Sequence, residues 1–348
     1  MVEVGKIGDK TLVLNGRYIS IFREGKLVWK KAYMAYPLPD GNLYLYRRRV
    51  RITELSGKTL TDYQVKIEIG ARDPIFAHAR SAGEDIRFCY HPEEDMLSYW
   101  IEKYDPDAEE AIIWVKVPEI PANSEIEIFM YYGNPEVPSA SDGEATFLFF
   151  EDFEDDAVGE FPAGWSVRED ASEIRVTDAD AYSGTKCLRI LDKGTQSDIS
   201  YAVHDFPSQT LIAMDIAARI QANAYSVFGI AETIPDYQKL PQASLELGKN
   251  DQNLYYGSDG TIVLIEADDL QWHEYTIIAD TENYIKILKD GVVKVENKPL
   301  YASVTSWKMV VLKPLEGTFS TSYDYYYDLI RVRKYASPEP SVTVGAEE

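Results

Sequence analysis

Aromatic residues in the second half of the chain are the residue types best suited to holding a saccharide. Sugar rings bind with their C–H face against an aromatic ring, while Asp, Asn or Gln side chains bond the hydroxyl groups. One tyrosine lies in the loop-like stretch IPDYQKLPQ, and two adjacent tyrosines lie beside glycines. Such positions favour exposure to solvent. The expected ligand-binding residues are these three tyrosines, Tyr237, Tyr255 and Tyr256, together with Trp165.

Most other aromatic residues of this region are expected to pack inside the protein. Trp272 opens the alternating run WHEYTII, and residues 325–327 belong to another such run. The four histidines are scattered, so the sequence offers neither a histidine metal site nor a Ser-His-Asp arrangement. The two cysteines, Cys89 and Cys187, are expected to be buried small apolar residues and not a disulfide.

The charge of the chain is strongly acidic, with 58 Asp and Glu against 35 Lys and Arg and a formal net charge of -23. Nucleic acid is therefore excluded as the main partner, because phosphate binding needs a basic surface. The first 50 residues differ, since they carry ten basic and four acidic residues. This basic front is expected to dock on acidic parts of the same chain or to attach the protein to a larger assembly.

The start of the chain has no apolar stretch of signal-peptide length, and no apolar run approaches the roughly 20 residues that a membrane helix needs. We therefore expect a soluble protein that is not inserted in a membrane. A virion component needs no signal peptide to reach the outside of a cell. The expected location is thus a virion or, second, the cell surface or extracellular space.

The elements that must position these residues are almost all strands, because apolar and polar residues alternate along most of the chain. Residues 1–43 predict a small basic β-meander of three strands. Short strands at sandwich-like intervals follow, and a polar linker interrupts them after Gly133-Asn134-Pro135. The predicted fold class is all-β, with the meander, a β-sandwich over 44–146 and a jelly roll over 147–348.

Six short segments of the middle domain carry a family resemblance. They are Tyr46-Arg47-Arg48, LTDYQV at 60–65, DIRF at 85–88, YWIE at 99–102, IWVKVP at 113–118 and YYGNP at 131–135. Through them the middle domain, from about residue 45 to 150, resembles DUF2341, a domain of unknown function found in archaeal and bacterial surface proteins. This resemblance implies a β domain and assigns no activity.

In the last domain, a second resemblance rests on the order and spacing of 150–153, Gly164-Trp165, WHEYTI at 272–277, the Asp290-Gly291 turn and YDLIRV at 327–332. These residues make the domain similar to the concanavalin A-like lectin and glucanase superfamily, which includes laminin-G-like modules. The similarity implies a jelly roll that binds saccharides, binds proteins or hydrolyses polysaccharides, so the fold alone does not choose among them.

Hydrolysis by the retaining glucanases of this superfamily needs the strand motif Glu-x-Asp-x-x-Glu, which this chain never completes. In many such sandwiches, acids of the first and last strands meet and hold a structural Ca²⁺. The expected ligands are Glu151, Asp152, Glu154 and Asp328. The alternatives are that these acids face water, or that Asp328 pairs with Arg331 or Arg333.

Together these observations predict a non-catalytic surface-recognition or adhesion protein whose last domain binds a glycan. A polysaccharide hydrolase and a purely structural virion or surface subunit are the two alternatives. Homo-oligomerisation is a further expectation. Binding predicts exposed aromatic residues without a close carboxylate pair, whereas hydrolysis predicts two acids that converge.

Overall fold

The computed structural model confirms the predicted all-β class. It describes residues 2–7, 10–15, 18–24, 26–32, 35–170, 172–193, 200–221, 226–234, 241–248, 252–256, 262–267, 269–282, 284–300, 303–314 and 322–348. The chain divides into two compact units: unit 1 contains Met1–Thr146 and Ser337–Glu348, and unit 2 contains Phe147–Ala336. Within the described residues, no helix has the length and apolar character needed to span a membrane.

The N-terminal sheet of unit 1 is antiparallel and has four strands, one more than the sequence predicts. Its strands follow chain order: β1 (Val2–Ile7), β2 (Lys10–Asn15), β3 (Tyr18–Arg23) and β4 (Lys26–Ala32). The three predicted strands correspond to β2, β3 and β4. The segment VEVGKI, which forms β1, is a weak strand pattern because it contains a glycine and only three apolar residues. The structure places this segment opposite β2 all the same.

The rest of unit 1 consists of a five-stranded sheet, a three-stranded sheet, a short hairpin and two helical turns. The five-stranded sheet has the order β10-β9-β13-β7-β29 and the three-stranded sheet the order β11-β12-β8. The elements are β5 (Tyr36–Pro37), β6 (Leu43–Tyr44), β7 (Tyr46–Thr53), β8 (Leu60–Ile69), α1 (Ile75–His78), β9 (Arg87–His91), β10 (Glu94–Met96), β11 (Tyr99–Asp105), β12 (Glu110–Ile120), β13 (Glu125–Tyr132), α2 (Gly143–Thr146) and β29 (Ser341–Glu347).

The core of unit 1 follows from period-2 alternation. On β7, Val50 and Ile52 are fully buried while Arg49 and Arg51 face outward. Fully buried Asp85 fixes the end of β13, because its two carboxylate oxygens accept hydrogen bonds from the backbone N–H groups of Arg80, Gly133 and Asn134 at 2.7 to 2.8 Å. A buried carboxylate that receives three donors is well satisfied.

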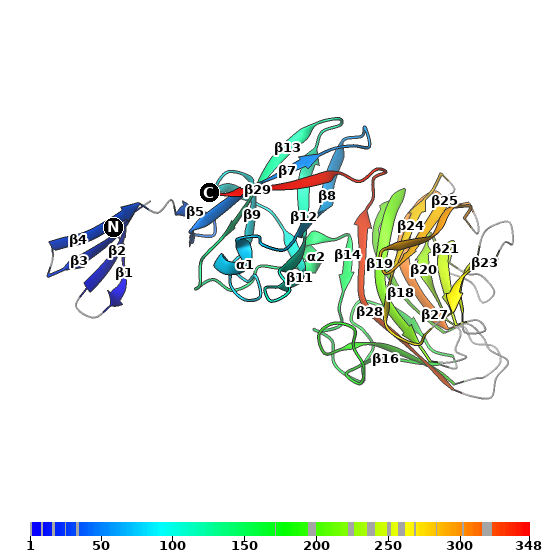
Figure 1. The fold of residues 1–348 in the computed structure, drawn as a ribbon. Helices are drawn as coiled ribbons and strands as arrows, with labels where there is room; N and C mark the ends of the chain where they lie inside the picture. The colour runs from blue at the N-terminus through cyan, green and yellow to red at the C-terminus, as the bar shows by residue number, and fades with distance from the viewer. Residues whose placement is uncertain are drawn as a thin grey trace. The chain divides into compact units, whose positions relative to one another are not determined.

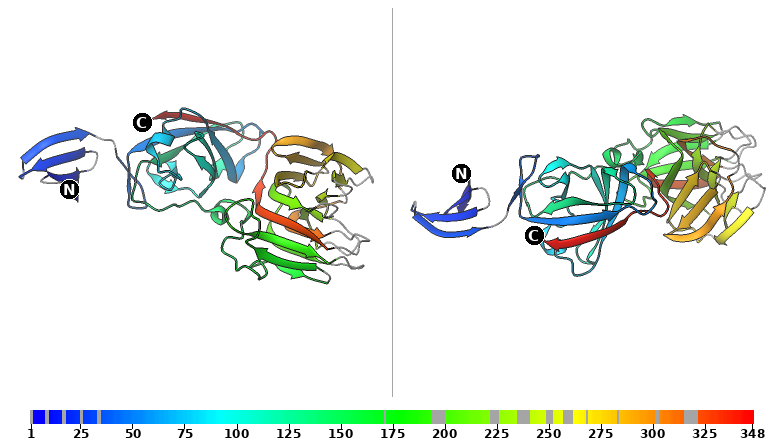
Figure 2. Two further views of the ribbon diagram at one scale, coloured as in Figure 1. Left: turned by 60° about the horizontal axis from the view of Figure 1, so that its bottom comes forward. Right: turned by 90° about the horizontal axis from the view of Figure 1, so that it is seen from above.

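The C-terminal strand belongs to unit 1, although the sequence boundaries placed residues 337–348 in the last domain. β29 pairs antiparallel with β7, with Thr343 opposite Arg51 and Val344 opposite Val50. Figure 2 shows this strand, in red at the C-terminus, beside the blue β7. The chain therefore leaves unit 1 after residue 146, forms unit 2, and returns to add the last strand of the five-stranded sheet of unit 1.

Unit 2 consists of two antiparallel sheets that share one core, which agrees with a β-sandwich of jelly-roll type (Figure 1). One sheet has the order β16-β17-β28-β19-β24-β25-β26, with β14 also paired to β28. Its strands are β14 (Phe149–Glu151), β16 (Ser172–Thr177), β17 (Cys187–Asp192), β19 (Leu211–Ile220), β24 (His273–Asp280), β25 (Tyr284–Lys289), β26 (Val292–Lys298) and β28 (Tyr323–Lys334).

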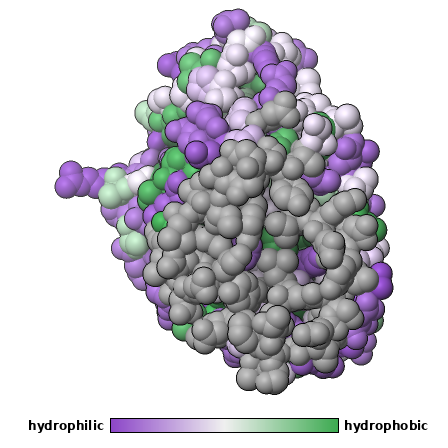
Figure 3. Space-filling view, turned by 90° about the vertical axis from the view of Figure 1, so that its right-hand side faces the viewer, coloured by the Kyte–Doolittle hydropathy of each residue, from purple (hydrophilic) through white to green (hydrophobic). Residues whose placement is uncertain are grey.

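The other sheet of unit 2 has the order β15-β18-β27-β20-β21-β22-β23. Its strands are β15 (Ser166–Arg168), β18 (Tyr201–Gln209), β20 (Ser226–Ala231), β21 (Ala243–Leu247), β22 (Gln252–Tyr256), β23 (Ile262–Ala267) and β27 (Trp307–Pro314). Large side chains from both sheets, among them Phe228, Tyr275, Trp307 and Tyr327, form the core. The described surface in Figure 3 is mainly hydrophilic, with only scattered hydrophobic residues.

Candidate functional site

The outward face of the sheet that contains β28 carries the site. Along β28 and β17, alternate residues such as Tyr325, Tyr327, Leu188 and Ile190 point into the core and are fully buried. Because successive side chains of a strand point to opposite faces, the residues between them point outward. Tyr326 is one of these, and it is half-buried.

Tyr326 lies in a line of side chains that crosses neighbouring strands. On one side it lies opposite Arg189 of β17, which lies opposite Arg175 of β16. On the other side it lies opposite Arg219 of β19. Trp272 comes directly before β24, the next strand, and its ring centroid is 6.4 Å from that of Tyr326. We call these five residues the arginine–aromatic row.

The aromatic end of the row consists of three rings in contact. Tyr182 is 40% exposed, and its ring centroid lies 5.9 Å from that of Trp272 with the planes inclined at 51°. Trp272 and Tyr326 are half-buried and inclined at 60°. The three rings therefore pack against one another and are partly open to solvent.

Asp180 holds the aromatic end in place. One of its carboxylate oxygens accepts a hydrogen bond from Trp272 Nε1 at 3.2 Å, and the other forms an ion pair with Arg219. Arg219 also donates from Nε to the carbonyl oxygen of Leu270 at 3.2 Å. The orientation of Trp272 is thus set by a hydrogen bond as well as by packing, so the site is preorganised.

The other two arginines of the row are also paired with acids. Arg189 Nε donates to Asp324 Oδ1 at 2.6 Å, and Gln221 Nε2 donates to the second Asp324 oxygen at 3.2 Å. Burial opposes the charge of Arg189, but the hydrogen bond to Asp324 outweighs it and raises the pKa of Arg189. Arg175 forms an ion pair of 2.5 Å with Glu169.

The loop that carries Asp180 and Tyr182 is tied to the sheet by two acids. Asp328 Oδ2 accepts hydrogen bonds from the backbone N–H groups of residues 182–183, each at 2.9 Å. Glu154 Oε1 accepts from the N–H groups of residues 185–186, each at 2.7 Å. Gly184 packs so closely that a Cβ there would lie 2.4 Å from the same oxygen. The position of Tyr182 therefore depends on acids that are remote in the sequence.

These contacts bear on the expected calcium ligands. Glu154 is engaged by the loop as described, and Glu151 accepts hydrogen bonds from Phe153 N at 2.8 Å and Trp165 Nε1 at 3.0 Å. Burial is the main cause that raises the pKa of Glu151 to about 7. Within the part of the chain that the structure describes, no group of three or more Asp, Glu, His or Cys side chains could hold a metal ion.

Asp152 and Asp328 are the two expected ligands that interact with each other. The pKa of Asp328 is raised to about 7, mainly by burial and also by the negative charge of Asp152. A cation beside these two carboxylates would relieve that repulsion. The calcium prediction for Glu151, Asp152, Glu154 and Asp328 stays a prediction. The alternative pairing of Asp328 is not observed, since Arg331 and Arg333 contact Asp215 instead.

Of the four expected saccharide-binding residues, the structure describes the side chain of Trp165. Trp165 is only 8% exposed and packs against Phe149 and Phe153, so it is a core residue and not a surface platform. Its ring nitrogen finds a partner in Glu151, which explains how a tryptophan can be buried there. Tyr237 lies outside the described residues, as do the side chains of Tyr255 and Tyr256. These three stay predictions.

Sequence reasoning missed Tyr182 and Tyr326 and expected Trp272 to be a packing residue. The alternation of Tyr325, Tyr326 and Tyr327 does indicate that the middle residue faces away from the core. No comparable signal marks Tyr182, which lies in a loop without periodicity. Its place beside Trp272 follows from hydrogen bonds to Asp328 that cannot be read from spacing.

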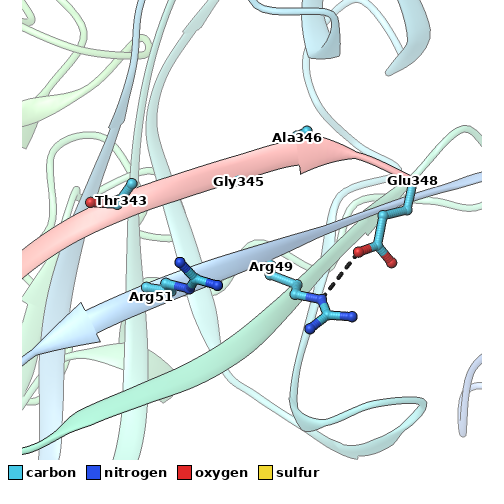
Figure 4. A pocket seen from close by; sticks show the side chains of 6 residues that line it. All are labelled: Arg49, Arg51, Thr343, Gly345, Ala346 and Glu348. Carbon is cyan, nitrogen blue, oxygen red and sulfur yellow. Dashed lines mark hydrogen bonds and ion pairs between the residues drawn. The ribbon is translucent and has the colours of Figure 1, made fainter.

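Unit 1 has a separate pocket on the β7 and β29 surface, lined by Arg49, Arg51, Thr343, Gly345, Ala346 and Glu348 (Figure 4). Arg49 Nε contacts Glu348 Oε1 at 3.1 Å, and Arg51 Nε contacts Glu127 Oε1 at 2.9 Å. Both guanidinium groups thus have carboxylate partners. The pocket contains no aromatic residue, so it lacks the features that suit a sugar ring.

Comparison with known proteins supports one of the two resemblances. A family model described as a domain of unknown function (DUF2341) matches residues 82–168. This match confirms the DUF2341 resemblance over that range, which extends from unit 1 into the start of unit 2. The similarity to the concanavalin A-like superfamily stays a prediction. A search of curated proteins finds no match.

Among solved structures, the chain is similar to a sialidase, with 11% identity, a TM-score of 0.43, and coverage of 60% of this chain and 20% of the sialidase. The chain therefore spans about a fifth of the length of that protein. An endo-beta-1,4-glucuronan lyase from the fungus Trichoderma reesei is 18% identical, with a TM-score of 0.41 and coverage of 55% and 96%. Cellulose induced protein Cip1 is 14% identical, with a TM-score of 0.42 and coverage of 54% and 97%.

Proposed function

We propose that unit 2 is a non-catalytic saccharide-binding module and that its ligand binds at the aromatic end of the arginine–aromatic row. The observation that carries this proposal is the contact of three partly exposed rings, Tyr182, Trp272 and Tyr326, with Asp180 and Arg219 beside them. Rings supply stacking surface, and the paired charges supply hydrogen-bond donors and acceptors.

Tyr182 is the ring on which a sugar would stack, because it is the most exposed of the three. The ring of Trp272 contacts that of Tyr182, and its Nε1 already donates a hydrogen bond to Asp180. A sugar hydroxyl could donate a hydrogen bond to the same carboxylate or accept one from the guanidinium of Arg219, which the ion pair with Asp180 holds in place. Little side-chain entropy would then be lost on binding, because the polar groups are ordered beforehand.

The proposal extends to a role in surface recognition or adhesion, on a virion or on a cell surface. Its support is the charge distribution: the first 50 residues are basic, while the remainder of the chain is strongly acidic. Opposite charges favour attachment of the basic segment to an acidic assembly.

The test is a glycan array probed with the full chain and with Trp272→Ala, Trp272→Phe and Tyr182→Ala. Truncation of a central aromatic residue at a binding site commonly costs about 2 kcal/mol, or about 30-fold in affinity. We expect both alanine variants to lose binding and Trp272→Phe to retain part of it. Tyr90→Ala, which removes a half-buried tyrosine of unit 1 and leaves unit 2 unchanged, is the matched control.

Two results would contradict the proposal. The saccharide function is refuted if the wild-type chain binds no glycan, or if the alanine variants bind as the wild type does while their melting temperatures are unchanged. Release of new reducing ends from a bound polysaccharide would show catalysis and favour the hydrolase alternative. Coverage of this face by a second copy in a stable homo-oligomer would favour the purely structural alternative.

A further inference from the structure

The arginine–aromatic row continues beyond Arg175, at the end opposite its aromatic end, and finishes at another exposed ring. Phe161 is 47% exposed, and the guanidinium carbon of Arg175 lies 4.3 Å from the centre of its ring. Residues 159–160 pair with the backbone of Val176, which brings this ring to the β16 side of the sheet. The row thus has Trp272 and Tyr182 at one end and Phe161 at the other, with Tyr326 between them.

The row is long compared with a single sugar ring. It crosses from β16 to the beginning of β24, which is four steps between neighbouring strands. Strands in a sheet are about 4.8 Å apart, so the row is about 19 Å long. Rings lie at both ends of the row and at Tyr326, and guanidinium groups lie between them, which places stacking surface and hydrogen-bond donors at intervals. Such a surface suits a chain that lies across the strands more than a single terminal sugar.

The charges of the row are balanced. Arg175, Arg189 and Arg219 have about one-third of their side-chain surface exposed, at 30%, 32% and 34%. Each of them contacts its own acid, which is Glu169, Asp324 or Asp180. A polyanion would therefore meet no excess of positive charge, and the net charge of -23 would repel it. A neutral ligand needs no excess of positive charge for binding, and the net charge of the chain does not repel it.

We infer that the arginine–aromatic row binds an extended, neutral oligosaccharide that lies across the strands from Trp272 to Phe161. This inference rests on the proposed saccharide function and adds to it the length and the charge class of the ligand. The exposed N–H groups of the paired arginines donate to sugar hydroxyls, and the rings at the two ends stack on separate sugar units. Affinity increases with chain length until the ligand reaches Phe161.

Isothermal titration calorimetry of the full chain tests the inference. The probes are the disaccharide and hexasaccharide of three neutral series, cellulose, xylan and mannan, and the anionic hexamer of galacturonic acid. For the series that binds, we expect the hexasaccharide to bind at least tenfold more tightly than the disaccharide. Binding of the neutral hexamer should not change between 50 mM and 500 mM salt, since no net charge is screened.

Variants at the two ends separate the inference from the proposed function. Phe161→Ala and Arg175→Ala should weaken the hexasaccharide about tenfold and leave the disaccharide unchanged, whereas Trp272→Ala should weaken both. Arg168→Ala is the matched control for Arg175→Ala, because Arg168 also forms an ion pair, with Asp170 at 3.0 Å, but lies on β15 of the other sheet. Melting temperatures show whether each variant is folded.

The outcomes are distinct. Equal affinity for disaccharide and hexasaccharide, or an unchanged hexasaccharide affinity in folded Phe161→Ala, would overturn the extended row while loss of binding in Trp272→Ala still supports the saccharide site. Tighter, salt-sensitive binding of the galacturonic acid hexamer would overturn the neutral ligand class. Failure of every neutral hexasaccharide to bind would overturn the inference, and an empty glycan array would overturn the proposed function with it.

Discussion

Asp215 is the residue whose removal should most clearly destabilise unit 2. It is 7% exposed, and one carboxylate oxygen contacts Arg331 Nε at 3.2 Å and Arg333 Nε at 3.1 Å. The other oxygen accepts a hydrogen bond from Thr276 Oγ1 at 2.6 Å. These contacts join β19, β24 and β28, three neighbouring strands of one sheet. The perturbation is Asp215→Asn, which keeps the shape and removes the charge.

The magnitude follows from the pKa of Asp215. Burial opposes ionisation, but the charges of Arg333 and Arg331 and the hydrogen bonds outweigh it and lower the pKa from 3.8 to about 2. At about 1.4 kcal/mol per unit, this lowering corresponds to about 2 to 3 kcal/mol of stability. Two buried guanidinium groups also lose their shared counter-charge, so the total loss at neutral pH should be about 3 to 5 kcal/mol.

The sign of the pH dependence is fixed by the direction of the shift. Because the pKa of folded Asp215 lies below its unfolded value, the stabilisation is complete above pH 3.8 and is lost as the pH falls toward 2. Urea unfolding of the full chain between pH 7 and pH 2.5 measures it, with hydrogen exchange of β19 and β28 to localise the effect. Exposed Asp205 of β18 provides the control Asp205→Asn.

Two outcomes would refute this reasoning. A difference below about 1 kcal/mol between wild type and Asp215→Asn at pH 7 would mean that the ion pairs contribute no more than exposed pairs do. A large difference that does not shrink between pH 4 and pH 2.5 would mean that the stability comes from packing and not from the charge of Asp215. The Asp205→Asn control should match the wild type throughout.

Three further predictions concern other parts of the fold. Replacing Asp85 by Ala leaves three backbone N–H groups of unit 1 without their acceptor and should cost about 3 kcal/mol in urea unfolding; a loss below about 1 kcal/mol would contradict it. Addition of Ca²⁺ after EDTA should raise the melting temperature of the wild type but not of Asp328→Asn, and equal melting temperatures would end the calcium prediction. Gly229→Ala should destabilise unit 2, because its Cβ would lie 2.1 Å from the Ala243 carbonyl oxygen, whereas Gly70→Ala, with open space, should not.

The strands were readable from the sequence because alternation is a local property. On β28, Tyr325 and Tyr327 are buried and Tyr326 between them is half-buried, as expected of successive residues in a strand. The resemblance to DUF2341 was readable for the same reason, since it rests on short segments, and those from residue 85 onward lie within the range that a family model matches. Local pattern does not say which strands become neighbours, and it therefore placed β29 in the wrong unit.

The candidate site was only partly readable. An aromatic residue is a core residue or a binding residue according to what covers it, and the sequence alone led us to expect binding by Trp165 and packing by Trp272. Packing against Phe149 and Phe153 encloses the first, whereas the second stays partly open beside Tyr182. The acids of the expected calcium site likewise acquire their roles from partners, such as the loop that Glu154 holds.

The sequence by itself determined the all-β class, the acidic character with a basic front, and the residue types from which a saccharide site could be built. Period-2 alternation and net charge are properties of neighbouring residues and of totals, so no contact is needed to read them. The tertiary structure alone decided that Arg175, Arg189, Tyr326 and Arg219 form one row across four strands. Strand order and register depend on which surfaces pack together across the whole chain, and they set which distant side chains become neighbours.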